Sequence, residues 1–566
     1  MREWWRDAAI YQLYVRSFGD ANGDGLGDLG GIRERLSYLA SLGVDAIWFS
    51  PWYVSPLADG GYDVADYRAI EPVYGSLSEA EQLIADAGAL GIRTIVDIVP
   101  NHVSSEHEWF QKALAEGPGS PYRDLFWFRP GRGHNGDEPP NDWPSEFRGG
   151  GVWTRTKNPD GSSGDWYMHL FATEQPDLNW DHPLVRAEHE SILRFWFDRG
   201  AAGVRIDSAV LLVKDPELSE VGDDVGAGAH PYVDRDDLHD IYKGWRAIAN
   251  SYDPPRVLIG ELWLEDNDRF TSYLASDELH TAFNFDFLTC AWDAMMLRAS
   301  IERTMAAHAA ADAPATWLLS NHDVTRPVTR YGREDSAFSF ETKRHGVPTD
   351  LDLGTRRARA AALLAMALPG VFYFYQGEEL GLPEVDIPLD RVQDPMHFRS
   401  GGRDPGRDGC RVPLPWRGSE PPYGFSPAGS AGEPWLPQPE GWATYTVESE
   451  EHDETSTLHL YRTALAVRRE LLVGRDAGFE WIESDPLVLH FRRGTTFECI
   501  VNFSDRPIAV PRGRQVVIAS RPVVTDASGP HVPPDGAAWS VSPPETSAAP
   551  DLEHRRDAGS EHTEKG

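Results

Sequence analysis

Short apolar runs alternate with longer amphipathic stretches through most of the chain. Residues 46–49 and 93–98 are short and largely apolar, as buried strands are, whereas residues 31–42 and 76–90 repeat their apolar positions every three or four residues, as helices do. Strands that alternate with helices predict a parallel sheet with helices outside it. About eight such units follow one another at the ~30-residue spacing of a barrel. The pattern therefore predicts an α/β protein with an eight-stranded (β/α)8 TIM barrel.

An open doubly wound sheet is the alternative arrangement of such units. It needs a glycine-rich, phosphate-binding turn after its first strand. The corresponding turn here, residues 23–31, is rich in glycine but also carries Asp24 and Asp28. Two acids in the turn oppose phosphate binding, so the barrel is the more economical prediction.

Three parts of the chain break the alternation. Residues 103–180, rich in Trp, Gly, Pro and Asn, predict a loop-rich subdomain inserted after the third strand. Residues 377–455 predict a long Gly/Pro-rich loop after the last strand. From residue 477 to 541 apolar positions recur every second residue, which predicts a C-terminal antiparallel β-domain. The remaining assignments are the barrel at residues 1–102 and 181–476 and a polar tail, expected to be disordered, at residues 542–566.

Composition and charge restrict the possible partners. The 566-residue chain is 41% hydrophobic, which is ordinary for a globular protein, and its formal net charge of −36 argues against nucleic acid. Three widely spaced cysteines predict neither a disulfide framework nor a cysteine metal cluster, and a reducing compartment fits them best. The first strand begins too early for a signal peptide, and no run of about 18 apolar residues predicts a membrane span. We expect a cytoplasmic protein.

A loop near the N-terminus has the composition of a calcium site. Oxygen-bearing side chains stand at alternate positions with glycines between them, a spacing that lets one tight loop surround a hard cation. It is not a complete EF-hand, because Gly31 stands at the twelfth position. A turn that needs no ion is the alternative. We predict a structural Ca²⁺ and no organic cofactor, with the ligands Asp20, Asn22, Asp24, the carbonyl of Leu26, and Asp28.

Four apolar runs end in acidic residues, namely Asp97, Asp207, Glu261 and Asp323. The carboxyl ends of barrel strands meet at one face, so these acids are expected to share a site. An Arg–Asp pair such as Arg205 with Asp207 can also be purely structural, but the recurrence favours a common site. Several close carboxylates serve metal chemistry or cleavage of an acetal, which takes one ionised acid and one protonated acid.

Five motifs resemble a known family. Residues 97–102, 203–207, 260–261 and 320–323, in that order, resemble the four regions that mark the α-amylase superfamily, glycoside hydrolase family 13. Residues 175–179, Gln-Pro-Asp-Leu-Asn, are similar to an additional motif of its oligo-1,6-glucosidase and α-glucosidase branch. The resemblance covers nearly the whole chain to about residue 541.

The resemblance implies a role for each matching residue. Asp207 is expected to be the nucleophile, Glu261 the general acid/base, and Asp323 a third acid that holds the hydroxyls of the sugar ring. Arg205 is expected to orient Asp207, and Asp97 to be mainly structural. The other substrate-binding residues implied are His102 and His322 in the cleaved subsite, Tyr62 and Asp63 in a sugar-capping loop, Phe171 in the pocket wall, and Arg411 closing the pocket.

These residues imply a retaining, exo-acting α-glucosidase for short oligosaccharides, working through a β-glucosyl ester on Asp207. Ser208 stands where the 1,6-specific branch typically carries Val, so α-1,4 bonds such as that of maltose are favoured. The alternatives are an α-glucosyltransferase or isomerase acting on maltose or sucrose, and a non-catalytic binding module on the same barrel. The expected partner is a small α-glucoside; the oligomeric state is not predicted.

Overall fold

An eight-stranded parallel sheet forms the centre of the protein. The computed structural model describes residues 3–221, 230–475 and 478–542, so all but the first residue of the tail expected to be disordered lies outside the described residues. In spatial order the strands are β1 (Ala9–Leu13), β2 (Ala46–Phe49), β5 (Arg93–Ile98), β9 (Gly203–Ile206), β10 (Val257–Gly260), β11 (Thr281–Ala282), β12 (Thr316–Leu318) and β13 (Val371–Tyr375).

The sheet closes into the predicted barrel. The first strand, β1, pairs in parallel with the last, β13, with Ala9 opposite Phe372. Between β11 and β12 the hydroxyl of Thr316 donates a hydrogen bond to the carbonyl of Ala282 at 2.7 Å. The strand β11 is only two residues long, too short to show a periodic pattern in the sequence. The (β/α)8 prediction is confirmed.

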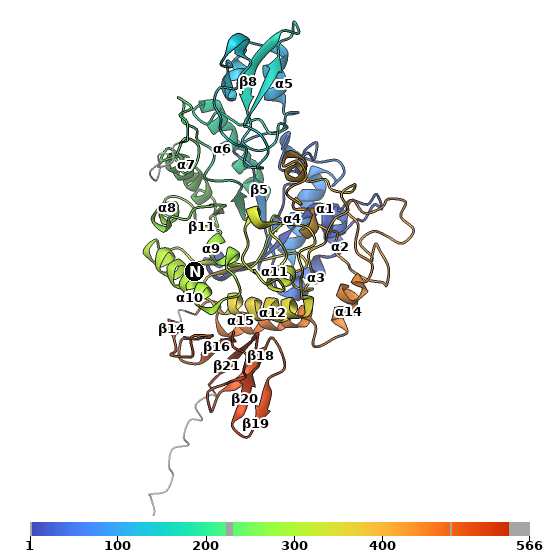
Figure 1. Cartoon of the computed structure of the whole chain (residues 1–566), viewed down its shortest axis with the longest axis vertical. Coiled ribbons are helices and arrows are strands. Elements are labelled where there is room, and N and C mark those ends of the chain that lie inside the picture. Colours follow the sequence, from blue (N-terminus) through green and yellow to red (C-terminus); the bar gives the residue numbers. More distant parts are fainter. Residues whose placement is uncertain (1–2, 222–229, 476–477, 543–566) are drawn as a thin grey trace, which may run out of the picture.

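Helices cover the outside of the barrel (Figure 1). In α4 (Leu77–Ala89), Ser76 and Glu79 form a capping box, and Leu83, Ile84 and Ala87 are buried toward the sheet. The other main barrel helices are α2 (Leu29–Glu34), α3 (Leu36–Leu42), α6 (Pro183–Asp198), α7 (Leu238–Asn250), α10 (Ala294–Ala310), α12 (Leu351–Ala367) and α15 (Thr457–Leu471).

Several loops at the carboxyl ends of the strands carry further structure. The hairpin of β3 (Tyr53–Val54) and β4 (Asp66–Ile70) follows β2 and presents the segment that contains Tyr62. Shorter helices line the later loops: α8 (Asn267–Ser272), α9 (Phe285–Thr289), α11 (Pro327–Tyr331), α13 (Pro395–Arg399) and α14 (Val447–Glu451).

The segment after β5 forms the projection at the top of Figure 1. It holds α5 (Glu108–Glu116) and a three-stranded antiparallel sheet of β6 (Phe128–Arg129), β8 (Ser163–Met168) and β7 (Trp153–Lys157). Its last part returns to the barrel, where Asp177 pairs with Lys214 at 2.8 Å and neither side chain is exposed. A fully buried ion pair needs good geometry, so this contact fixes the subdomain on the barrel.

Two antiparallel sheets lie at the opposite end of the chain. The larger sheet packs on α12, where the indole of Trp539 donates to the carbonyl of Leu363 at 3.1 Å. Its strands are β14 (Phe479–Trp481), β15 (Val488–Arg493), β16 (Phe497–Asn502), β21 (Gly536–Val541) and β18 (Gln515–Ala519). The smaller sheet consists of β17 (Ile508–Ala509), β20 (Gly529–Val532) and β19 (Val524–Asp526).

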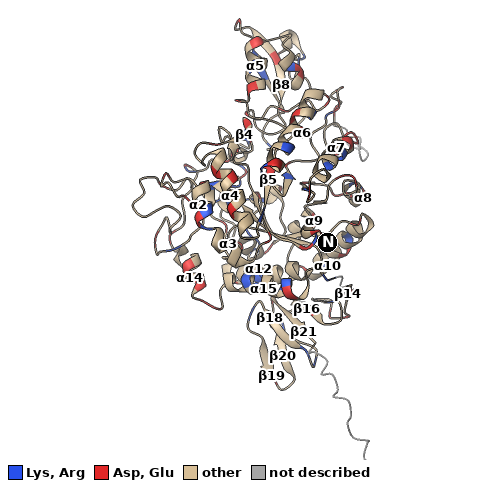
Figure 2. Ribbon diagram, turned by 180° about the vertical axis from the view of Figure 1, so that it is seen from behind, with Lys and Arg blue, Asp and Glu red and all other residues tan. Residues whose placement is uncertain are grey.

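Charged residues are scattered over the outer helices and loops, with acids on helices as far apart as α4 and α14 (Figure 2). No helix in the described part of the chain has the length and apolar character needed to cross a membrane.

Candidate active site

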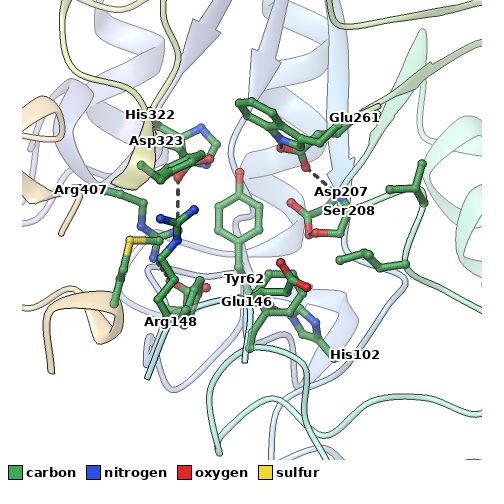
Figure 3. A pocket seen from close by; sticks show the side chains of 18 of the residues that line it. Tyr62, His102, Glu146, Arg148, Asp207, Ser208, Glu261, His322, Asp323 and Arg407 are labelled. Atoms are coloured by element: carbon green, nitrogen blue, oxygen red, sulfur yellow. Dashed lines mark hydrogen bonds and ion pairs between the residues drawn. The ribbon is translucent and has the colours of Figure 1, made fainter. Parts of the chain in front are cut away.

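A pocket opens at the carboxyl ends of the barrel strands, with a volume of about 310 Å³. That is at the small end of the range for small-molecule sites, about 300–1,000 Å³. Figure 3 shows Tyr62 in the middle of the view, with Asp207 and Glu261 on one side and Asp323 on the other. Of the ten residues expected to act on substrate, nine surround this cavity or touch its acids: Asp207, Glu261, Asp323, Tyr62, His102, Phe171, Arg205, His322 and Arg411.

The guanidinium group of Arg205 holds three carboxylates together beneath the pocket. Its Nη1 lies 2.9 Å from Asp97 and 2.6 Å from Asp207, and its Nη2 lies 2.6 Å from Glu261. Arg205 is only 1% exposed, so these bonds are shielded from water. Two acids held by neighbouring nitrogens of one group must lie close together, as a retaining mechanism requires at about 5 Å.

The turn after β9 orients the two acids above Arg205. Ser208 has a φ of +45°, in the left-handed region that is strained for a non-glycine residue. In that conformation its N–H donates to Oε2 of Glu261 at 2.9 Å, and its hydroxyl donates to Oδ2 of Asp207 at 3.0 Å. Burial raises the pKa of Asp207, while Arg205 and the Ser208 hydroxyl favour its ionised form.

Glu261 retains a proton more readily than an ordinary glutamate. Burial, together with the negative charges of Asp207 and Asp323, raises its pKa to about 7, although Arg205 opposes the shift. Near neutral pH this carboxyl group is therefore divided between its acidic and basic forms. A group poised in this way suits general acid/base catalysis.

Asp323 lies in the opposite electrostatic environment. Its Oδ1 is 2.7 Å from Nη2 of Arg411 and 3.2 Å from Nη1 of Arg407. Burial alone would raise its pKa, but the charges that face it hold the pKa of this carboxyl well below its ordinary value. Asp323 is therefore ionised throughout the physiological range, unlike Glu261.

Neutral rings form the floor of the pocket. The ring of Tyr62 stacks on His322, with centroids 5.1 Å apart and planes at 4°. Burial lowers the pKa of His322 to about 3. Because Gln12 donates to Nδ1 of His322 at 2.6 Å, the proton sits on Nε2, which lies 3.3 Å from Asp323. Burial also lowers the pKa of His102, whose Nε2 contacts the carbonyl of Tyr62 at 3.1 Å.

The prediction for Asp63 needs correction. Both oxygens of Asp63 accept main-chain N–H bonds, from Ala58 at 2.9 Å and from Asp59 at 3.0 Å, and the residue is fully buried. Asp63 therefore shapes the loop and does not line the pocket. The carboxylate that this loop presents to the cavity is that of Asp59. The two acids are only four residues apart in the sequence, and the sequence does not show which of them faces the cavity.

The prediction for Arg411 also needs correction. Arg411 is 2% exposed and lies behind Asp323, and its Nε donates to the carbonyl of His322 at 2.8 Å. Of the two arginines of this segment, Arg407 is the one that lines the pocket, and its Nη2 lies 2.6 Å from Oδ1 of Asp59. A short 3₁₀ turn, Asp408–Cys410, separates the two arginines and directs them differently.

The outer wall of the pocket was not predicted. It comes from the inserted subdomain, which supplies Glu146, Phe147 and Arg148, and from barrel loops that supply Trp263 and Phe340. Arg148 forms an ion pair with Glu341, so the two sources meet across the rim. These residues follow no periodic pattern or motif, and only the folding of distant loops brings them together.

The loop expected to bind calcium is closed by its own backbone. Asp20 accepts from the N–H groups of Gly23 and Gly25, and Asp28 from those of Ala21, Asn22 and Gly31. In the described residues no group of three or more acidic, histidine or cysteine side chains is placed to hold a metal. The donor chemistry still suits a hard cation, because Asp20 and Asp28 are 1% and 5% exposed and form no ion pair with a described Lys or Arg, although the charge of Arg35 acts on both.

Comparisons with known proteins agree with this geometry. The chain is 35% identical over 529 residues to a protein of Rhizobium meliloti (strain 1021) named "Probable alpha-glucosidase", with 89% of this chain and 90% of that protein covered. It is 32% identical over 545 residues to an "Oligo-1,6-glucosidase" of Parageobacillus thermoglucosidasius, with 89% and 91% covered. The crystal structure of an alpha-glucosyl transfer enzyme superposes with a TM-score of 0.81 at 32% identity, covering 96% of this chain and 100% of that one.

The sequence family described as "Alpha amylase, catalytic domain" matches residues 12–474. That match takes in the barrel from the end of β1 through β13 and all of the residues that line the pocket. The relatives named above extend the likeness over nearly the whole chain. The chain belongs to the alpha-amylase family of glycoside hydrolases, family 13.

Proposed function

We propose that this protein is a retaining, exo-acting α-glucosidase that removes the terminal glucose of short α-glucosides. The observation that carries the proposal is the contact of Arg205 with both Asp207 and Glu261 at 2.6 Å, in a pocket that also contains Asp323. One ionised and one protonated carboxyl at short range is the arrangement for a double displacement at an acetal carbon.

In the first step Asp207 attacks the anomeric carbon and forms a β-glucosyl ester. Glu261 gives its proton to the departing oxygen, so the bond to the leaving group breaks as the ester forms. In the second step Glu261, now ionised, takes a proton from water as the water attacks the ester. Asp323, held ionised by Arg407 and Arg411, grips ring hydroxyls and stabilises positive charge on the ring in the transition state.

Exo action follows from the closed end of the pocket. Asp59 and Arg407 face the cavity and bond to each other at 2.6 Å. Arg407 is further fixed by Asp394, whose Oδ2 is 2.7 Å from its Nε. A rigid carboxylate–guanidinium pair offers hydrogen bonds to the hydroxyls of a terminal sugar, and we expect it to stop a longer chain from extending past that sugar.

A glucosyltransferase acting through the same ester is the second candidate. The structural likeness to an alpha-glucosyl transfer enzyme at 32% identity favours it, as do the apolar side chains of Val210, Leu211 and Trp263 in the lining of the pocket. Apolar surface near the leaving group disfavours ordered water there and favours a sugar or other alcohol as acceptor.

Product analysis separates the two candidates. We expect purified protein to release glucose from maltose faster than from isomaltose or sucrose, with the α configuration of the product retained in early NMR spectra. Oligosaccharides or sucrose isomers as the main products, with little free glucose, would instead identify a transferase or isomerase. Release of β-glucose would exclude the double displacement altogether.

The pH dependence follows from the two acids. Glu261 must be protonated to act as the acid, and its pKa is raised to about 7, so kcat/KM should fall about tenfold per pH unit above that value. At low pH kcat/KM should fall as Asp207 becomes protonated. Glu261→Gln should lower maltose turnover by roughly 10²–10⁴-fold and remove the alkaline fall. An alkaline fall that persists in this variant at the same pH would assign that pKa to another group.

We also propose Ca²⁺ as a structural ion in the loop of residues 20–28, held by the side chains of Asp20, Asn22, Asp24 and Asp28 and the carbonyl of Leu26. Two buried carboxylates that form no ion pair with a described Lys or Arg support this proposal, and the charge of Arg35 acts on them without such a contact. The ion would add positive charge next to both carboxylates and fix the loop that follows β1. A cytoplasmic location is likewise proposed, and the three free, buried cysteines support it.

Calcium binding is testable through stability. At 100 times its Kd, a ligand specific to the folded state adds about 2.7 kcal/mol to the free energy of unfolding. We therefore expect millimolar Ca²⁺ to raise the Tm of metal-stripped protein, and Asp20→Asn to abolish the response. Asp160→Asn, at an exposed turn, is the matched control and should respond as the wild type does. An unchanged Tm in wild-type protein, with no calcium retained after dialysis, would establish the loop as an ion-free turn.

A further inference from the structure

The two oxygens of Glu261 have different neighbours, and the difference decides where its proton can sit. Oε2 accepts hydrogen bonds from Nη2 of Arg205 at 2.6 Å and from the N–H of Ser208 at 2.9 Å. Both partners are donors that keep their hydrogens, so both lone pairs of Oε2 are occupied. The proton that Glu261 delivers to the leaving group must therefore be carried on Oε1.

Oε1 has one hydrogen-bond partner in the described residues, the indole of Trp263, whose Nε1–H donates to it at 3.1 Å. That bond occupies one lone pair of Oε1 and leaves the other for the proton. The residue lies just beyond β10, two positions after Glu261. The indole therefore restrains both the rotation of the carboxyl group and the direction in which its acidic hydrogen points.

The ring of Trp263 is itself rigidly supported. It stacks on Phe285 with centroids 3.6 Å apart and planes at 6°, and it meets the ring of Phe340 at 60° and 5.7 Å. Trp263 is nevertheless 38% exposed and lines the pocket together with Phe340. An exposed, immobile aromatic face beside the proton-carrying oxygen is a surface on which a sugar or aryl group can rest.

We propose that Trp263 is a positioning residue for the acid: its N–H aims Oε1 of Glu261 at the leaving group, and its ring forms the wall on which that leaving group lies. The inference rests on the proposed glucosidase function and extends it to the leaving-group side of the pocket. The site then favours a flat or apolar face on the departing unit.

Other charges around Glu261 act on it whether or not the indole is present. Arg205 and Asp207 from β9 and Asp323 from the loop after β12 face its carboxyl group. The inserted subdomain adds Glu146 and Arg148 to the same cavity. Replacing Trp263 with Phe leaves these charges in place, removes the N–H donor and keeps a smaller aromatic ring, so the pH dependence reports on the donor and KM reports on the ring.

The test compares Trp263→Phe with wild type in kcat/KM against pH, using maltose and 4-nitrophenyl α-glucoside. The indole N–H donates to ionised Glu261, so its removal should raise the pKa of Glu261. The alkaline fall of kcat/KM should then begin about half to one pH unit higher. Maltose needs a proton on its departing oxygen, so its kcat/KM should fall about tenfold or more. The nitrophenolate leaves with little assistance, so its kcat/KM should change by less than about threefold.

Phe147→Leu is the matched control, because it alters the pocket wall at a ring that packs on Phe171 and has no ring contact with Trp263 in the described residues. It should change KM and leave the alkaline limb in place. Trp263→Tyr, which keeps a stacking ring, serves if the phenylalanine variant folds poorly. An unshifted alkaline limb in the folded Trp263 variant, or an equal loss of kcat/KM with both substrates, would overturn the inference. Trp263 would then be only a part of the pocket wall. Wild-type protein that releases no glucose from either substrate would instead refute the proposed function.

Discussion

One buried guanidinium group shared by three carboxyl groups is the constraint on which this site depends. Asp97, Asp207 and Glu261 all contact Arg205, and burial is severe enough that ionised acids need a compensating charge. A single positive charge cannot balance three negative ones in that environment. The cluster therefore retains protons, and burial raises the pKa of Asp97 to about 8 and that of Glu261 to about 7. The proposed acid catalysis at neutral pH depends on this shortage of positive charge.

On the side of the pocket that contains Asp323 and Asp59, arginine side chains compensate the negative charge of the carboxylates. Asp323 faces two arginines and stays ionised, and Asp59 pairs with one of them. The pocket thus contains an acid that can hold a proton and an acid that cannot, within one small cavity. The barrel makes this possible because residues from β9, β10 and the loop after β12 end at the same face. In the proposed reaction the sugar ring is bound between these two environments.

The sequence revealed the parts of this arrangement that depend on local pattern. Strands that end in Asp207, Glu261 and Asp323 were recognisable because an apolar run followed by an acid is a local signal, and eight units in series predicted the barrel. The roles of the acids stay predictions. Asp59 and Arg407 were missed because each has a similar neighbour four residues away, Asp63 and Arg411, and main-chain hydrogen bonds decide which one faces the cavity. Trp263 carries no sequence signal, since its function depends on the stack with Phe285.

The central claim is that Arg205 holds Asp207 in position to form a covalent ester. The most direct measurement is to trap that ester with 5-fluoro-α-D-glucosyl fluoride, digest the protein, and locate the added mass by tandem mass spectrometry. The account predicts a stoichiometric label on Asp207, and a much slower build-up of the same label in Arg205→Lys, which cannot contact three carboxyl groups with a fixed fork. A label on another residue, or normal turnover with no covalent species, would contradict it.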